Sequence, residues 1–383
     1  MKANKYKIKP TLDQKEKLSQ NFGCARFIYN LALSKKKELW KSEQKNISRL
    51  ELQTLLVQMK KEESTSWLNN AHSQVLQSSL MHLDNAFKNF FKKKARHPTF
   101  KKKYRSQSIQ YPQGVKIKEN QIFLPKIGWV KAIIHREAVG KIKTVTVSKD
   151  ATDCYYASVL LDNNTIKPEK KKHIESHIGI DMGIKHFLVS SDKKKIENPK
   201  FAERQLKNLK QKQKKLSNKK RGSIRYKKAK KLVAKIHKKT KDARNDFQHK
   251  LSLKLASKNQ AVSIETLSML EMSKNRILSR RLYDIGWYQF TQKLSYKLED
   301  RGNSLVRIDR FFPSTKTCSY CNHILDDISF SVRNWTCDQC GTKHNRDINA
   351  SINIDYQGMI KLKAEGFTVS ARGGYVRLSH RQQ

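Results

Sequence analysis

The chain has 383 residues, of which 37% are hydrophobic, enough for two or three globular domains with real cores. It carries 81 Lys and Arg against 33 Asp and Glu, a net charge of +48 that exceeds what solubility requires. No run of 18 apolar residues occurs, and the first residues lack the apolar stretch of a signal peptide. We therefore expect a cytoplasmic protein with no membrane partner.

The charge indicates that a large polyanion is the partner, because a field of one sign repels itself until phosphates neutralise it. A lysine-rich proteome is the alternative explanation, but it accounts poorly for an excess of this size. A protein that binds a membrane surface would need a basic helix with a clean apolar face or a lipidation signal, and no lipidation signal is evident.

The first hundred residues predict a strand followed by helices. Tyr6 and Ile8 alternate with lysines, which is typical of a short strand, and Pro10 ends it. Thr11 and Gln14 have the spacing of a helix capping box. The apolar residues that follow recur at helical intervals and predict core packing in two helices. These residues are Leu18, Phe22, Ala25 and Tyr29 in the first helix, and Leu76, Leu80, Leu83, Phe87 and Phe90 in the second.

A basic and aromatic segment, residues 92–105, follows the second helix. Its lysines and arginines could contact phosphates while Phe100 and Tyr104 stack on bases, although a solvated loop with two core anchors is nearly as good an interpretation. The candidate nucleic-acid contacts here are Arg96, Lys101 and Lys102. Short β-type runs between residues 109 and 161 then predict a small sheet or barrel, and the polar residues 163–172 a linker.

The second half predicts an α/β core, because strands and helices alternate along it. Strands are expected at residues 177–181, 187–189, 261–264 and 305–308, and helices at 287–298 and 347–360. Two long helices between residues 205 and 255 have narrow apolar stripes, so that their other faces are almost entirely basic. We favour a surface laid along a phosphate backbone over a solvated hairpin. Its candidate contacts are Lys227, Lys228, Lys230 and Lys231.

Three acidic residues stand at the ends of these core elements. Asp181 and Glu265 each close an apolar strand, and Asp347 begins a helix. Hydrolysis of a phosphodiester by two Mg²⁺ ions needs a few carboxylates that share the metals with substrate oxygens. Each acid alone could be a strand-end cap, but the three together predict a catalytic magnesium site.

Four of the six cysteines form two Cys-x-x-Cys pairs separated by fifteen residues. Each short loop can present two thiolates to one tetrahedral ion, so Cys318, Cys321, Cys337 and Cys340 predict one structural zinc. His323 and His344 lie nearby and are interpreted as bystanders. Cys24 and Cys154 stand alone and are interpreted as ordinary buried thiols.

Several segments resemble, in the same order along the chain, the RuvC, zinc and N-terminal motifs of the TnpB/OrfB insertion-sequence family. They are His177–Lys185, Ile264–Leu267, Phe311–Ser319 and Cys340–Ala350, together with Asn21–Asn30 and Pro98–Lys101 in the first half. The resemblance covers almost the whole chain. It implies an RNA-guided DNA endonuclease related to type V CRISPR effectors, with two catalytic Mg²⁺ ions and one structural zinc as cofactors. The implied partners are a guide RNA derived from the transposon end and double-stranded target DNA, and the protein would act as a monomer in the RNA complex.

The resemblance also implies a domain organisation around an RNase H/RuvC-like α/β core. Residues 1–10 and 101–172 would form a β-barrel wedge domain, with a helical recognition domain at 11–100 inserted in it. Residues 173–315 and 342–383 would form the nuclease domain, with the zinc ribbon at 316–341.

Residue by residue, the family's catalytic acids match Asp181, Glu265 and Asp347, and its zinc ligands match the four paired cysteines. Two positions depart from the family pattern, with Thr266 and Asn345 standing where Asp is frequent. We expect these departures to change polarity around the acids and the rate more than the reaction. Arg310 and Arg346 are further candidates for nucleic-acid contacts.

Two other functions fit the same scaffold. One is a nuclease-inactive regulator that binds DNA, either guided by RNA or directly, which the three intact acids argue against. The other is a transposase that joins strands directly. The position of the zinc module before the last acid, and the lack of a recognisable helix-turn-helix that binds DNA ends, favour the guided nuclease.

Overall fold

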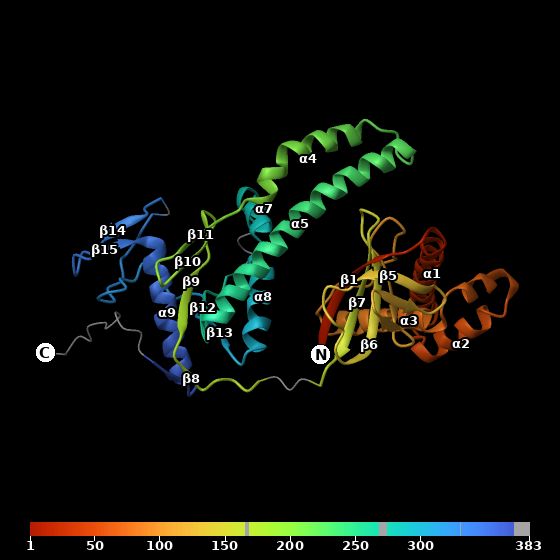
Figure 1. The fold of residues 1–383 in the computed structure, drawn as a ribbon, viewed down its shortest axis with the longest axis horizontal. Coiled ribbons are helices and arrows are strands. Elements are labelled where there is room, and N and C mark those ends of the chain that lie inside the picture. Colours follow the sequence, from red (N-terminus) through yellow and green to blue (C-terminus); the bar gives the residue numbers. More distant parts are fainter. Residues whose placement is uncertain (165–167, 268–273, 330, 371–383) are drawn as a thin grey trace. The chain divides into compact units, whose positions relative to one another are not determined.

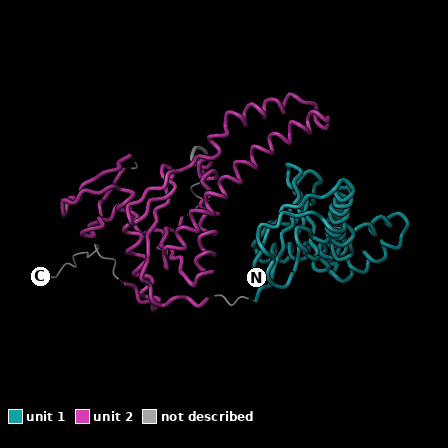
Figure 2. The backbone as a smooth tube through the Cα atoms, viewed as in Figure 1, with its two compact units in different colours: residues 1–165 teal, residues 166–383 magenta. Residues whose placement is uncertain are grey.

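The computed structural model describes residues 1–164, 168–267, 274–329 and 331–370 and divides the chain into two compact units, Met1–Thr165 and Ile166–Gln383 (Figures 1 and 2). Each unit has its own hydrophobic core. Within the described residues, no helix is both long and apolar enough to cross a membrane.

The first unit contains a seven-stranded antiparallel sheet with the strand order β2-β6-β7-β1-β5-β4-β3. Tyr6 and Ile8 point into its core while the lysines that alternate with them, Lys5, Lys7 and Lys9, face outward, as the alternation predicts. The pairings of the described strands run from β2 to β3 without closing a ring, so a closed barrel stays a prediction. The strands are β1 (Lys2–Lys9), β2 (Gln107–Tyr111), β3 (Lys116–Lys118), β4 (Gln121–Leu124), β5 (Gly128–Ile133), β6 (Lys141–Lys149) and β7 (Tyr155–Asp162).

Helices fill the chain between β1 and β2 in this unit. They are α1 (Leu12–Glu43), α2 (Arg49–Met59), the 3-10 helix η1 (Glu63–Asn70) and α3 (Ser73–Phe91). The predicted capping box is present, with Thr11 and Gln14 bonding each other's backbone at the start of α1. Leu18 and Phe22 of α1 pack on the sheet, whereas Leu33 joins Leu76 in a second, helical core.

The second unit is built on a mixed five-stranded sheet of order β11-β10-β9-β12-β13. The last three strands in this order are parallel, and β10 pairs antiparallel with β9 and β11. The strands are β9 (His177–Asp181), β10 (His186–Ser190), β11 (Lys195–Glu197), β12 (Ala261–Ile264) and β13 (Ser304–Arg307). Two small pairs accompany this sheet: β8 (His173–Ile174) with β16 (Thr368–Val369), and β14 (Asn334–Thr336) with β15 (Lys343–Asn345).

Helices cover both faces of this sheet, which makes the unit an α/β fold (Figure 1). They are α4 (Phe201–Ser217), α5 (Ile224–Lys258), α7 (Arg276–Ile285), α8 (Trp287–Glu299) and α9 (Arg346–Ala364). Ile178 and Ile180 of β9 join the core with α5 and α8. The opposite face meets α9, since a Cβ added to Gly179 would fall 2.3 Å from the carbonyl oxygen of Ser351.

The α4–α5 pair forms a long hairpin that extends from the sheet (Figure 1). No residue of α4 is buried, and the buried residues of α5 lie from Ile236 onward. The predicted narrow apolar stripes are therefore confirmed: the two helices pack on each other, and only the second half of α5 enters the core. The outer part of the hairpin presents a lysine-rich surface to solvent.

Candidate functional site

Two of the predicted acids lie at the carboxyl ends of neighbouring parallel strands. Asp181 is the last residue of β9, and Glu265 directly follows β12. The register pairs Ile180 with Ile264, so the two acids occupy matching positions one residue beyond this pair. Side chains alternate between the two faces of a strand. Asp181 therefore lies on the side of Gly179, which is the face covered by α9.

The third acid reaches the same face from the first turn of α9. Asn345 caps this helix, its side-chain oxygen accepting the N–H of Ile348 at 3.4 Å, and Asp347 follows in the first turn. The helix packs closely on the sheet because a glycine stands at two contact points, Gly179 on β9 and Gly358 on α9. A Cβ at Gly358 would overlap the hydroxyl of Ser263.

The electrostatics show that the three acids act on one another. Burial raises the pKa of Asp181 to about 8, and the charges of Glu265 and Asp347 add to this increase. Arg346 and Arg333 oppose it. A carboxyl group in such surroundings gains from a cation that neutralises its neighbours.

Two of the acids are also held by partners that the sequence analysis missed. Ser314 donates its hydroxyl hydrogen to the carboxylate of Glu265, and Arg333 pairs with Asp347 at 3.0 Å. In the described part of the chain, the three carboxylates are not gathered as tightly as the four cysteine thiols are. Ser314 lies within a quoted family motif, so its position carried a signal, whereas Arg333 is one basic residue among many.

The two departures from the family pattern have structural roles. Thr266 donates its hydroxyl to the carbonyl oxygen of Ile308 at 2.7 Å, which fixes the chain just beyond Glu265. Asn345 is the cap of α9 and also donates to the side chain of Asn334 at 3.1 Å. Among the described residues, the side chains of Thr266 and Asn345 form hydrogen bonds with these groups and not with the three acids.

The four paired cysteines converge on one point. Their sulfur atoms all lie within 4.8 Å of one another, and the pairs Cys318–Cys340 and Cys321–Cys337 are each separated by 3.7 Å. A tetrahedral zinc with bonds of about 2.3 Å requires sulfur atoms about 3.8 Å apart. The geometry therefore fits a single four-thiolate metal ion.

The surroundings of the cysteines shift their pKa values in both directions, since burial raises those of Cys318 and Cys321. The hydrogen bond between Cys340 and the side chain of Thr342, 3.2 Å long, lowers the pKa of Cys340 to about 6, which makes its thiolate available at neutral pH. His344 lies outside the cluster, but its Nε2 atom is 3.0 Å from Cys318 Sγ and its ring packs on Trp335. His344 is not one of the four clustered residues, as its interpretation as a bystander to the metal expects, although it contacts one of the cysteines.

The candidate nucleic-acid residues lie in separate places. In α5, Lys227, Lys228 and Lys230 are exposed. In the first unit, the ammonium group of Lys101 lies 4.0 Å from the ring centre of Tyr29, and that of Lys102 lies 6.0 Å from Tyr104. Arg96 is exposed, Lys231 is partly buried, Arg310 stacks on Phe311 at 5.4 Å, and Arg346 bonds the carbonyl oxygen of Ser329 at 3.1 Å.

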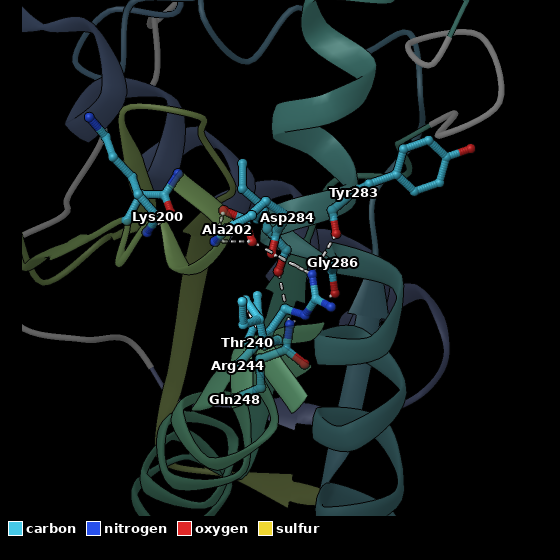
Figure 3. A network of polar contacts seen from close by, with 11 residues as sticks. Lys200, Ala202, Thr240, Arg244, Gln248, Tyr283, Asp284 and Gly286 are labelled. Atoms are coloured by element: carbon cyan, nitrogen blue, oxygen red, sulfur yellow. Dashed lines mark hydrogen bonds and ion pairs between the residues drawn. The ribbon is translucent and has the colours of Figure 1, made fainter. Parts of the chain in front are cut away.

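The base of the α4–α5 hairpin is fixed to the core by a polar network (Figure 3). The carboxylate of Asp284 accepts the N–H of Ala202 at 3.0 and 2.9 Å, in the first turn of α4. Arg244 of α5 donates to the carbonyl oxygens of Tyr283 and Asp284 at 2.7 and 2.9 Å. Gln248, also on α5, donates to the carbonyl oxygens of Ile285 and Gly286. The hairpin is therefore held at its root, through contacts on α7 and the turn into α8.

Three sequence families match successive parts of the chain. Residues 152–276 match OrfB_IS605, described as "Probable transposase", and residues 287–354 match the "Cas12f1-like, TNB domain". Residues 1–45 match HTH_OrfB_IS605, described as "Helix-turn-helix domain". We expected no recognisable helix-turn-helix from the sequence, and this match to a helix-turn-helix family corrects that expectation. In the structure, these residues form strand β1 and the single long helix α1.

Relatives match over most of the chain. A Streptomyces pristinaespiralis protein named "Putative RNA-guided DNA endonuclease" is 36% identical over 384 residues, covering 98% of this chain and 92% of that protein. The Escherichia coli (strain K12) protein "Putative RNA-guided DNA endonuclease InsQ" is 30% identical, covering 92% and 91%. The fold is similar to that in the structure titled "Cryo-EM structure of the Cas12f1-sgRNA-target DNA complex", with a TM-score of 0.55, 16% identity, and coverage of 90% and 82%. This chain belongs to the TnpB/OrfB family of insertion-sequence proteins.

Proposed function

We propose that this protein is an RNA-guided DNA endonuclease that hydrolyses phosphodiester bonds of target DNA at Asp181, Glu265 and Asp347. The observation that carries the proposal is the placement of these acids on one face of the sheet, where their charges interact. Because the chain carries a net charge of +48, three acids placed on one face of the sheet favour a functional site over ordinary surface charge. The names of the relatives and of the similar structure agree with this activity.

The donor set fits magnesium. Carboxylate oxygens are hard ligands, and a divalent cation would offset the burial and the neighbouring charges that raise the pKa of Asp181. When bound, two Mg²⁺ ions would activate a water molecule and stabilise the leaving 3′ oxygen. The chain itself supplies Ser314 to orient Glu265 and Arg333 to orient Asp347. The cysteine cluster would hold one structural zinc beside this site.

The basic surface would hold the nucleic acids. We assign the guide RNA, derived from the transposon end, and the target DNA to contacts with Lys and Arg in the α4–α5 hairpin and in the first unit. The first unit would supply the wedge strands and the helical recognition domain, and the second the nuclease and the zinc ribbon. Base pairing would supply sequence specificity, so the protein needs only to hold the RNA–DNA duplex by its backbone.

The test is to purify the protein as a complex with its RNA and incubate it with Mg²⁺ and a supercoiled plasmid library, with and without that RNA. RNA-dependent cleavage beside a short common sequence supports the proposal. Binding without cleavage would indicate the regulator, and strand joining independent of RNA would indicate the transposase. Sequencing the co-purified RNA identifies the guide.

A further inference from the structure

A single turn of chain, the Ser314 turn (residues 313–318), runs from the proposed magnesium site to the cysteine cluster. The N–H groups of Lys316 and Thr317 both donate to the carbonyl oxygen of Pro313 at 3.0 Å, which closes the turn. Ser314 is 4% exposed at one end and bonds Glu265. Cys318, at the other end, is the first cysteine of the cluster.

Two buried asparagines of α9 form hydrogen bonds with the backbone of this turn. Asn349 and Asn353 are one helical turn apart and are 1% and 0% exposed. Asn349 donates to the carbonyl oxygen of Thr317 at 2.8 Å and accepts the N–H of Ser319 at 2.9 Å. Asn353 donates to the carbonyl oxygens of Ser314 and Thr317 at 2.8 and 2.6 Å. Buried amides with partners of this kind fix the distance between two elements.

The same helix carries Asp347 two residues before Asn349. The hydrogen bonds of Asn349 and Asn353 to the Ser314 turn therefore connect Glu265, through Ser314, to α9, the helix that carries Asp347. A hydroxyl that donates to one carboxylate oxygen restricts the rotation of the carboxylate and leaves the other oxygen for a cation.

We propose that Ser314 is a positioning residue for the metal site: it holds Glu265 in the orientation that binds a divalent cation, and Asn349 and Asn353 fix Ser314 to α9. This inference rests on the proposed function for the identity of the site. Loss of a group that orients a metal ligand typically weakens metal affinity 10- to 100-fold. Removal of the Ser314 hydroxyl is expected to weaken Mn²⁺ binding by about 10-fold.

The experiment compares Ser314→Ala with Thr315→Ala in the full chain bound to its RNA. Thr315 is the matched control, because it is the adjacent hydroxyl and the structure gives its side chain no hydrogen bond to the described residues. Mn²⁺ affinity is measured by isothermal titration, and cleavage is measured across Mg²⁺ concentrations. Zinc content and RNA affinity are measured alongside and are expected to match the wild type in both variants.

Ser314→Ala should bind Mn²⁺ more weakly and need more Mg²⁺ for half-maximal cleavage, with most of the maximal rate restored at saturating Mg²⁺. Thr315→Ala should behave as the wild type. Equal Mn²⁺ affinity in all three proteins, equal losses in both variants, or absence of Mn²⁺ binding by the wild type would each overturn the positioning role. A wild type that binds Mn²⁺ but cuts no guided target would contradict the proposed function alone, since the Mn²⁺ titrations still decide the role of Ser314.

Discussion

Replacing Asp181 by Asn should stabilise the protein when Mg²⁺ is absent. The pKa of Asp181 rises from 3.8 to about 8 on folding, because burial and the charges of Glu265 and Asp347 disfavour the carboxylate. Between pH 3.8 and about pH 8, the folded state therefore keeps a proton on Asp181 that the unfolded state has released. Stability therefore falls as the pH rises from about 4 to about 8. Asn lacks this charge and escapes the loss.

The size of the effect follows from the shift. At pH 7, about 3 pH units above the unfolded pKa, the folded protein still binds the proton that the unfolded chain has released, which sets a ceiling of about 4 kcal/mol. An amide buried in place of the acid loses part of this gain, so we expect roughly 1–3 kcal/mol. For a unit of this size, each kcal/mol moves the melting temperature by about 2–4 °C.

The assay is thermal unfolding from pH 5 to pH 8 in buffer freed of Mg²⁺ without a chelator, so that zinc is retained. The melting temperature of Asp181→Asn should exceed that of the wild type increasingly as the pH rises, and added Mg²⁺ should narrow the gap. Asp246→Asn, at an exposed acid of α5, should change stability by less than about 0.5 kcal/mol. An Asp181→Asn protein that melts below the wild type at pH 8 would refute the reasoning.

Two further predictions concern zinc and salt. Metal analysis should find one zinc per chain, and Cys337→Ser should lose it and destabilise the second unit; folded, active wild-type protein without zinc would contradict this. Replacing four lysines of α5 by Gln should flatten the plot of log RNA affinity against log salt by about 0.7–0.9 per lost phosphate contact. An unchanged slope would mean that the hairpin does not touch the RNA. These lysines are Lys227, Lys228, Lys230 and Lys231.

Local patterns in the sequence were enough to find the elements that carry the site. Asp181 and Glu265 close apolar runs, and such runs predict strands, which the structure confirms as β9 and β12. The four-cysteine spacing likewise predicted the cluster. These features are set by neighbours in the chain, so one sequence displays them.

Features that depend on tertiary contacts were missed. Ser314 reaches Glu265 from 49 residues away, and Arg333 reaches Asp347 across the β14–β15 region. The contact between His344 and Cys318 arises only when the two Cys-x-x-Cys loops come together. The helix-turn-helix match was missed for another reason: residues 1–45 form a strand and one helix, so their pattern contains no second helix to recognise.

The central claim is tested most directly by separating binding from cutting with Asp181→Ala. This change removes one carboxylate from the site and leaves the exposed lysines of α5 unchanged. Guide RNA and target DNA should bind with roughly wild-type affinity, while Mg²⁺-dependent cleavage falls by several orders of magnitude. Cleavage of target DNA by Asp181→Ala at near the wild-type rate would contradict the account and move the activity away from these three acids.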